Sequence, residues 1–540
     1  MMGNKKNILI LFLFIVSGFV FYYPTRHAGF AMDFISWERH FIHDSIADVL
    51  TSFGWPAQQQ VSLFLFYLMF HLFHLNGVYW YLVFTTMHAV NAWLLFILFQ
   101  KIFLRFQIPG AGITSLAGTL LFFLSPYQAE VVVWKVCFQY LLTGAFMLLI
   151  LLSTVSYLGS GKSRYLYFIV LFFALALFSF EWALVIPLLT AVVAIAWNMN
   201  DAQKGWRKKT FYVLGVQLIF LPVYLLLNKA RFGSWVGHYG QNVHLHFDFY
   251  QVVSTALKYA VKYLFFLRDF SPSVKTPVFN FFDQHSVALV LFILGVLSFI
   301  LMIIFYRKIS MRVRVAGFCL LLFLISLIPV INLYMSTLLQ SENDRYGYFA
   351  SMFFFMMLAL LIFSLHRFFR YTLVMTWVII SVVLLVRMNF LWMHAGEVFS
   401  GLIKDFRWYD KKEVIILNIP DSYHGVWMFR IINAPTGFAE CLDLIRNEPY
   451  TGKMIDVAQY NMMHPSDGVS VQQDSLRQLH VQFNQGGNWW WRNGMGAGDY
   501  ETEDFKVHFD WAYTLMMKND NPDRVFIYQV GDKWKEVTFP

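Results

Sequence analysis

Long apolar runs with few polar interruptions dominate the first 391 residues of the chain. A helix needs roughly 20 mostly apolar residues to cross the hydrocarbon core of a bilayer. The sequence predicts eleven transmembrane helices, near 7–23, 79–100, 111–125, 140–158, 165–181, 182–198, 210–228, 285–306, 313–333, 346–366 and 371–391. Two further apolar stretches, 61–75 and 250–267, do not fit the alternation of these runs, and we interpret both as helices at the outer interface.

Basic residues gather in alternate gaps between these runs, and those gaps contain a single acid, Asp201. Short loops rich in Lys and Arg remain in the cytoplasm. This rule places the N-terminus in the cytoplasm and the residues beyond 391 outside. The basic residues are Lys5, Lys6, Lys101, Arg105, Lys162, Arg164, Lys204, Arg207, Lys208, Lys209, Arg307, Lys308, Arg312, Arg314, Arg367 and Arg370.

The composition agrees with a membrane protein, because hydrophobic residues make up 58% of the chain and charged residues only 14%. Soluble proteins carry about a quarter charged residues. The net charge of +9 is unevenly divided, since residues 392–540 hold 14 Lys and Arg against 20 Asp and Glu. The basic excess therefore lies in the short loops of the membrane part, where it sets topology. We expect membrane lipids as partners and no nucleic acid.

Several motifs are missing, and their absence disfavours whole classes of chemistry. The three cysteines form no CxxC pair, which argues against a disulfide scaffold and a cysteine zinc site. No glycine-rich phosphate-binding motif follows a predicted strand, which argues against ATP-driven and dinucleotide chemistry. His244, His246 and Asp248 are close in sequence, but their segment leads into a helix. We predict no metal site and no cofactor, and leave open a dependence on a divalent cation.

Residues 392–540 lack apolar runs of spanning length and predict one soluble α+β domain, separate from a membrane domain over 1–391. The segments VIILNIP and RVFIYQV predict strands, and a helix is expected around 439–446. Trp489, Trp490 and Trp491 either dock this domain on the membrane interface or stack on sugar rings, and docking is favoured.

Acids are confined to one side of the predicted membrane domain. Of its twelve, only Asp201 is cytoplasmic and the other eleven fall at outer ends or loops. None lies within a span, so a proton or ion relay through the bilayer would have no carboxylates to use. The outer acids, basic residues and aromatics that draw attention are Asp33, Glu38, Glu130, Trp134, Glu181, Arg231, Arg345 and Tyr346.

Such groups suit the transfer of a sugar from a lipid-anchored phosphate to an external hydroxyl. A carboxylate can take the hydroxyl proton, and a guanidinium can hold a phosphate through two hydrogen bonds. Asp33 is the expected base, with Glu38 as the reserve. The nearest basic residue to Glu130 in the sequence is Lys135, and the alternative reading of Glu130 is a helix-end carboxylate that the helix dipole favours. Arg345 has Glu342 and Asp344 beside it, so its alternative readings are a local ion pair and a side chain that extends to the interface.

At these residues the chain resembles the GT-C fold glycosyltransferases that use polyprenyl-phosphate sugars. It is most similar to the O-mannosyltransferase-like membrane proteins that often carry TPR repeats. Asp33 matches the acid of their first outer loop, and SPYQAEVVVW matches a His-Pro-x-x-x-Glu-x-x-x-Trp pattern at Glu130 and Trp134. LFSFEWALVIP resembles a Ser-Lys-Glu helix start at Glu181, and NDRYGYF resembles a Glu-Arg-Tyr motif at Arg345.

The resemblance implies a GT-C-like catalytic domain in a bacterial inner membrane. Its expected reaction moves a monosaccharide, with inversion, from polyprenyl phosphate to a hydroxyl of an extracytoplasmic protein, glycan or lipid. Asp33 would be the base, and the donor phosphate would bind Arg345, Tyr346 and Arg231. The pocket would be lined by Glu130, Glu181, Trp134 and Glu38.

Three other functions remain open at this point. One is a polysaccharide polymerase or ligase that uses a diphosphate-linked donor. Another is a lipid or sugar transporter without catalysis, which the one-sided acids disfavour. A catalytically inactive scaffold is the third. The family has a pair of acids in the first outer loop, and one of them is replaced here by Met32. The family's lysine before the glutamate at position 181 is replaced by Phe180.

The alternation of basic gaps gives a direct test of topology. A reporter fused after Pro540 is expected to be extracytoplasmic, and one inserted between Asn200 and Lys204 cytoplasmic. Paired alkaline phosphatase and green fluorescent protein fusions measure both positions. Reporters that read the same side at both positions would show that the number of spans is wrong.

Overall fold

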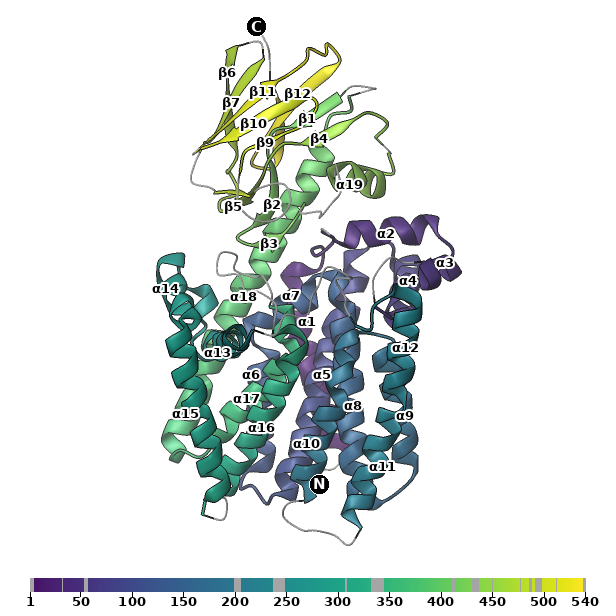
Figure 1. Ribbon diagram of the computed structural model, residues 1–540, viewed down its shortest axis with the longest axis vertical. Coiled ribbons are helices and arrows are strands. Elements are labelled where there is room, and N and C mark those ends of the chain that lie inside the picture. Colours follow the sequence, from purple (N-terminus) through teal and green to yellow (C-terminus); the bar gives the residue numbers. More distant parts are fainter. Residues whose placement is uncertain are drawn as a thin grey trace.

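The computed structural model describes two parts that follow one another along the chain, a helical bundle and a strand-rich domain at one end of it (Figure 1). The N-terminus lies at the opposite end of the bundle, away from the strands. The described residues are 4–31, 33–52, 57–198, 205–236, 248–305, 308–331, 344–409, 413–429, 437–448, 450–475, 477–484, 488–490, 498–510 and 512–537.

Within these ranges, nine helices are long and apolar enough to cross a membrane, or ten when a bent pair at Pro126 counts as one span. The expected fold class, a polytopic helical membrane protein with a C-terminal α+β domain, is confirmed. The spans are built from α1 (Asn4–Tyr22), α5 (Gly77–Arg105), α8 (Phe138–Ser160), α10 (Ile186–Asn198), α11 (Trp206–Leu218) with α12 (Phe220–Phe232), α15 (His285–Ile304), α16 (Met311–Leu327), α17 (Tyr348–Ile362) and α18 (Arg367–Asp405).

One of the eleven expected spans is shorter than predicted. The run 165–181 forms α9 (Arg164–Leu177), a helix of 14 residues. It rises only about 21 Å, which is less than the hydrocarbon thickness. The helix stops because the chain turns at Phe178 before the 3-10 helix η4 (Glu181–Val185).

The bent pair interrupts the bundle at the end that faces the C-terminal domain. Helix α6 (Ala111–Phe123) is followed by η2 (Pro126–Gln128) and α7 (Ala129–Val133), with a bend of 54°. Pro126 cannot continue a helix from the preceding turn, but it suits the first turn of the next one. After α7 the chain is extended at Trp134, turns through η3 (Lys135–Cys137) and enters α8.

The loop of residues 27–31, which follows α1, is hydrogen-bonded to the residues after this bend. Gly29 has a φ of +87°, and a Cβ there would overlap the carbonyl oxygen of Val133, so only glycine fits. The backbone nitrogen of Lys135 donates to the Gly29 oxygen at 3.2 Å. The indole of Trp134 donates to the Ala31 oxygen at 3.1 Å. These bonds fix the chain just before α2 (Asp33–His43), which continues through α3 (Ile46–Ser52).

Both stretches expected as interfacial helices are helical. They form α4 (Gln60–Phe73) and α13 (Phe249–Phe265), and α13 runs across the direction of the bundle (Figure 1). Asp248 caps α13 by accepting from the backbone nitrogens of Tyr250 and Gln251. The cap satisfies donors that a helix start leaves unpaired.

The C-terminal domain is connected to the bundle by α18, a helix of 39 residues that continues beyond the membrane part (Figure 1). The boundary predicted after residue 391 falls inside this helix. Helix α19 (Gly437–Arg446) forms where a helix was expected, and β1 (Glu413–Ile416), β2 (Ile419–Tyr423) and β12 (Arg524–Val530) form in the segments predicted as strands.

Three small sheets make up the rest of the domain. Their strand orders are β13-β12-β1-β4, β6-β7-β11-β10-β9 and β3-β2-β5-β8, and β1 is parallel to both of its neighbours. The remaining strands are β3 (Val426–Trp427), β4 (Met454–Asp456), β5 (Gln459–Met462), β6 (Val469–Ser475), β7 (Gln478–Phe483), β8 (Asn488–Trp490), β9 (Tyr500–Glu501), β10 (Phe505–Phe509), β11 (Tyr513–Met517) and β13 (Lys533–Glu536).

Candidate functional site

A buried ion pair lies where the bend at Pro126 meets the start of α17. The Nη1 atom of Arg345 is 2.6 Å from Oε1 of Glu130, and the backbone nitrogen of Arg345 donates to Oε2 at 2.7 Å. Glu130 is fully buried, and the Arg345 side chain is 17% exposed. The pair joins residues 215 positions apart. Lys135 is the base nearest to Glu130 in the sequence, but the ion pair that the structure describes for Glu130 is this long-range contact.

Aromatic rings surround the Arg345 guanidinium. Its central carbon lies 5.1 Å from the ring centroid of Trp134 and 4.5 Å from that of Tyr346. It also donates to the Tyr346 hydroxyl at 3.1 Å. Gly347 follows at a position where a Cβ would overlap the hydroxyl oxygen of Tyr263, so no side chain fits there. The Arg-Tyr-Gly sequence is thus fixed in place from several sides.

A second buried ion pair adjoins the first. Lys262 of α13 pairs with Asp344, and both side chains are almost completely buried. The Lys262 ammonium lies 5.0 Å from the ring centroid of Tyr127, and the Tyr127 hydroxyl donates to the Lys262 carbonyl oxygen at 2.7 Å. The start of α17 is therefore tied to the helix that crosses the bundle as well as to the bend at Pro126.

The candidate base, Asp33, is the first residue of α2 and is half-exposed. Cys137 lies within electrostatic range of Asp33, Glu130 and Arg345 at once, so the three charged groups share one region. Because the loop before Asp33 is bonded to the turn around Trp134, this proximity follows from the backbone contacts already described. The structure thus gathers Asp33, Glu130, Trp134 and Arg345, with Tyr346, at the end of the bundle that faces the C-terminal domain.

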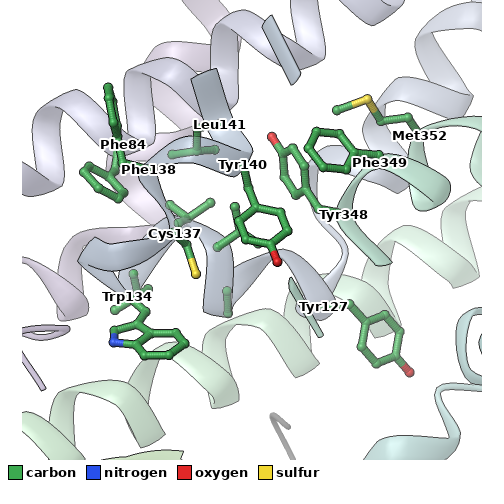
Figure 2. Close-up of a cluster of buried hydrophobic side chains, with 14 of the residues drawn as sticks. Phe84, Tyr127, Trp134, Cys137, Phe138, Tyr140, Leu141, Tyr348, Phe349 and Met352 are labelled. Atoms are coloured by element: carbon green, nitrogen blue, oxygen red, sulfur yellow. The ribbon is translucent and has the colours of Figure 1, made fainter. Parts of the chain in front are cut away.

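An aromatic core packs against the start of α17, with Tyr140 beside Tyr348 and Phe349 (Figure 2). The rings of Trp182 and Phe349 stack with their centroids 3.8 Å apart, and Tyr140 stacks on the same Phe349 at 5.8 Å. Deeper in the bundle, the Tyr348 hydroxyl is 3.1 Å from Nδ1 of His88 and also accepts from Asn91. Close packing and the hydrogen bonds of the Tyr348 hydroxyl hold this end of α17 in one position.

Two predicted site residues are engaged elsewhere. Arg231 donates to the Leu50 carbonyl oxygen at 2.8 Å and to Gln58 at 3.2 Å, so it binds the segment between α3 and α4. Glu181, at the turn into α10, interacts electrostatically with Tyr224 of α12. Neither contact belongs to the group around Arg345.

Glu38 is buried between the two parts of the protein. Helix α2 packs against α19, and Glu38 lies within electrostatic range of Cys441 on that helix. Neither of its carboxylate oxygens has a hydrogen-bond partner among the described residues. Burial raises the pKa of Glu38 well above its usual range. Glu38 therefore lies at the contact between the two domains.

Sequence reasoning missed Lys135. Its side chain is 1% exposed, and its ammonium lies 5.3 Å from the ring centroid of Phe84 and 5.7 Å from that of Phe30. No carboxylate in the described part of the chain forms an ion pair with it. A lysine directly after Trp134, beside an apolar run, was the available signal, because an ammonium buried without a carboxylate is costly.

The C-terminal domain contributes Trp427, which was also missed. Its indole nitrogen lies 3.5 Å from Oε1 of Glu130, and its ring centroid is 6.5 Å from that of Trp134. Trp427 stands at the end of the turn between β2 and β3, where His424 and Gly425 have positive φ. A separate domain thus reaches the buried ion pair.

The residues considered for metal binding lie only partly within the described ranges. No three His, Cys, Asp or Glu side chains in those ranges are grouped as a metal would require. His244 and His246 lie outside the described residues, as does Trp491. The side chains of Trp489 and Trp490 are not described either.

No protein-family model and no curated protein matches the sequence. The crystal structure of ArnT from Cupriavidus metallidurans in the apo state aligns over 82% of this chain and 88% of that chain, with 10% identity and a TM-score of 0.35. A similarity of this size says nothing about the reaction, which has to be inferred from the side chains.

The buried carboxyl of Glu38 predicts an unusual dependence of stability on pH. With its pKa raised in the folded state, Glu38 is neutral there, whereas in the unfolded chain it ionises above roughly pH 4.3. Rising pH therefore favours unfolding, by up to about 1.4 kcal/mol per pH unit, until the folded-state pKa is reached. Glu38→Gln removes this cost.

Thermal unfolding of wild type and Glu38→Gln between about pH 5 and pH 7.5 measures the effect. We expect the stability difference to shift towards the variant as pH rises. Glu503→Gln, at an exposed carboxylate, is the matched control and should show no such trend. A pH-independent difference for Glu38→Gln would mean that this carboxyl is ionised in the folded protein.

Proposed function

We propose that this integral membrane protein is a glycosyltransferase, which moves a monosaccharide from a polyprenyl-phosphate donor to an extracytoplasmic hydroxyl. The observation that carries the proposal is the gathering of Asp33, Glu130 and Arg345 at one end of the bundle. A half-exposed carboxylate beside buried cations, at the end of membrane-spanning helices, suits a reaction between a lipid-borne phosphate and a soluble acceptor.

In the proposed reaction, Asp33 accepts the proton of the acceptor hydroxyl. The hydroxyl oxygen then attacks the anomeric carbon from the side opposite the phosphate. The new carbon–oxygen bond forms as the bond to the phosphate oxygen breaks, so the configuration inverts. The electron pair of the broken bond leaves with polyprenyl phosphate, whose negative charge grows as the sugar departs.

The growing charge on the phosphate needs a fixed cation in a site with little water. Arg345 is held in a defined orientation, but much of its charge is offset by Glu130 at 2.6 Å. Lys135 has no such carboxylate in the described chain, and its ammonium is already removed from water. We therefore assign Lys135 the main role in stabilising the leaving phosphate. Arg345 would position the rings of Trp134 and Tyr346, which surround its guanidinium.

Replacing the base tests the reaction directly. Asp33→Asn preserves the shape of the side chain and removes its basicity. Because a positioned base contributes about 10²–10⁴ in rate, transfer should fall by that factor while the protein still inserts and binds donor. Transfer of radiolabelled sugar from polyprenyl phosphate measures the rate, with Asp44→Asn at an exposed carboxylate as the control.

The same variant separates the proposal from the other functions. A transporter would continue to move its cargo after Asp33→Asn, and a scaffold would transfer no sugar even as wild type. Transfer by Asp33→Asn at the wild-type rate would show that another group is the base.

Replacing Lys135 by Met tests the assignment of the cation. Met removes the charge but keeps a similar volume, so the folded protein should be as stable as wild type or more stable, because a buried ammonium without a carboxylate is costly. Turnover should nevertheless fall by about 10²–10³, the usual loss on removing one group that stabilises developing negative charge.

The two readouts together, thermal unfolding and turnover, identify the role of Lys135. Loss of stability with unchanged turnover per folded molecule would mean that Lys135 is only structural. Arg345→Lys serves as the comparison, since it keeps a charge but loses the planar group that contacts Glu130, and it should reduce stability as well as turnover.

A further inference from the structure

A cavity of about 160 Å³ lies between the membrane domain and the C-terminal domain. One wall is the loop of residues 27–31 that precedes Asp33, and a second is the part of α18 around Trp392 and Ala395. The C-terminal domain closes the cavity with Trp427 of β3 and Ile445 of α19. Both domains are therefore needed to form it.

Its size suits one six-membered ring. An engineered protein cavity of roughly 150 Å³ holds a benzene molecule. The chain of a polyprenyl lipid is far longer than this space, and a peptide of several residues would not fit either. The space thus holds about one ring of a ligand, and any longer part of that ligand would extend through its open side.

Charge excludes the donor phosphate from this space. Among the described residues that line the cavity there is no Lys, Arg, Asp or Glu, and the one titratable side chain is His27. Burial, together with the nearby Arg26, lowers the pKa of His27, so its imidazole is neutral at pH 7. The phosphate needs a cation, and the cations of the site are Lys135 and Arg345, neither of which lines the cavity.

The wall combines aromatic faces with a few polar groups. Phe30, Trp392, Phe399 and Trp427 supply rings, and Ser400 supplies a hydroxyl. In addition, the buried indole nitrogen of Trp392 has no hydrogen-bond partner among the described residues. An unpaired buried donor beside a cavity is costly unless a bound group accepts its hydrogen bond. A wall of this kind suits a ring with an apolar face and polar edges.

The position of the cavity connects it to the reaction. Ala31 lines it, and Asp33 follows two residues later, at most about 7 Å along the chain. A ring held in the cavity would therefore lie close to the proposed base.

From these observations we infer that the cavity binds a pyranose ring of the acceptor, so that the acceptor is a glycan or glycoside and the C-terminal domain takes part in selecting it. The statement that the ligand is an acceptor rests on the proposed function. Binding of a sugar in the cavity does not itself require that the protein transfers one. Trp392 and Trp427 would contact the ring, and Asp33, which lies just outside the cavity, would take the proton of a hydroxyl at its edge.

Filling the cavity tests the inference. Ala395 is buried on α18 and lines the cavity, so Ala395→Leu should occupy the space with no loss of stability. Val383→Leu, at a largely exposed position of the same helix, is the matched control. Ser400→Leu fills the space from a neighbouring position and replaces Ala395→Leu if thermal unfolding shows that variant to be unstable.

The full-length protein in detergent micelles is titrated with methyl α-D-glucopyranoside, mannopyranoside and galactopyranoside, and saturation-transfer NMR reports binding. We expect at least one glycoside to bind wild type and Val383→Leu, and to bind Ala395→Leu at least about tenfold more weakly. Cyclohexanol, a ring with a single hydroxyl, serves as the apolar control. Absence of glycoside binding, binding of cyclohexanol alone, or equal binding to Ala395→Leu would each overturn the inference.

A transfer assay separates this inference from the proposed function. Ala395→Leu should raise the KM for the acceptor by about tenfold or more and leave the KM for the donor unchanged. A raised KM for the donor would indicate that the donor binds in the cavity, and this result would overturn the inference. If no transfer is found at all, the proposed function fails, while the glycoside titration still decides whether the cavity binds a sugar.

Discussion

The carboxylate of Glu130 is the group on which the end of the bundle that faces the C-terminal domain depends. It binds the side chain and the backbone nitrogen of Arg345, and it lies beside the indole of Trp427. One fully buried group therefore joins the bend at Pro126, the start of α17 and the C-terminal domain. A buried carboxylate is stable only with such partners, since removing one member of a buried pair typically costs about 3–5 kcal/mol. The geometry around Asp33 and Lys135 is held by the same arrangement.

The apolar runs predicted most of the spans because hydrophobic length is a local property of the chain. The run at 165–181 was misjudged because composition does not show where a helix turns, and the turn at Phe178 divides it. The strands at VIILNIP and RVFIYQV and the helix at 439–446 could be predicted for the same local reason. These predictions concern single helices and strands, whereas the candidate site depends on contacts between them.

Contacts between distant residues could not be read from the sequence. Glu130 had Lys135 as its nearest base, and yet its partner is Arg345, 215 residues away. Arg231 resembled a phosphate ligand by its outer position, but it binds the carbonyl oxygen of Leu50. Trp427 was one aromatic residue among many in a domain without recognisable motifs. Only the fold shows which of these side chains share a space.

The single helix α18 has a consequence for how the two domains can move. It continues from the membrane part without a break over 39 residues and packs against β2, β3 and α19 of the C-terminal domain, so the described helix itself contains no hinge. Each residue of a helix sets both a rise of about 1.5 Å and a rotation of about 100°. The number of residues in α18 therefore fixes the angular phase of the C-terminal domain relative to the bundle. Insertion or deletion of one residue would rotate Trp427 away from Glu130, so the length of this helix is under as strict a constraint as the identity of any side chain in the site.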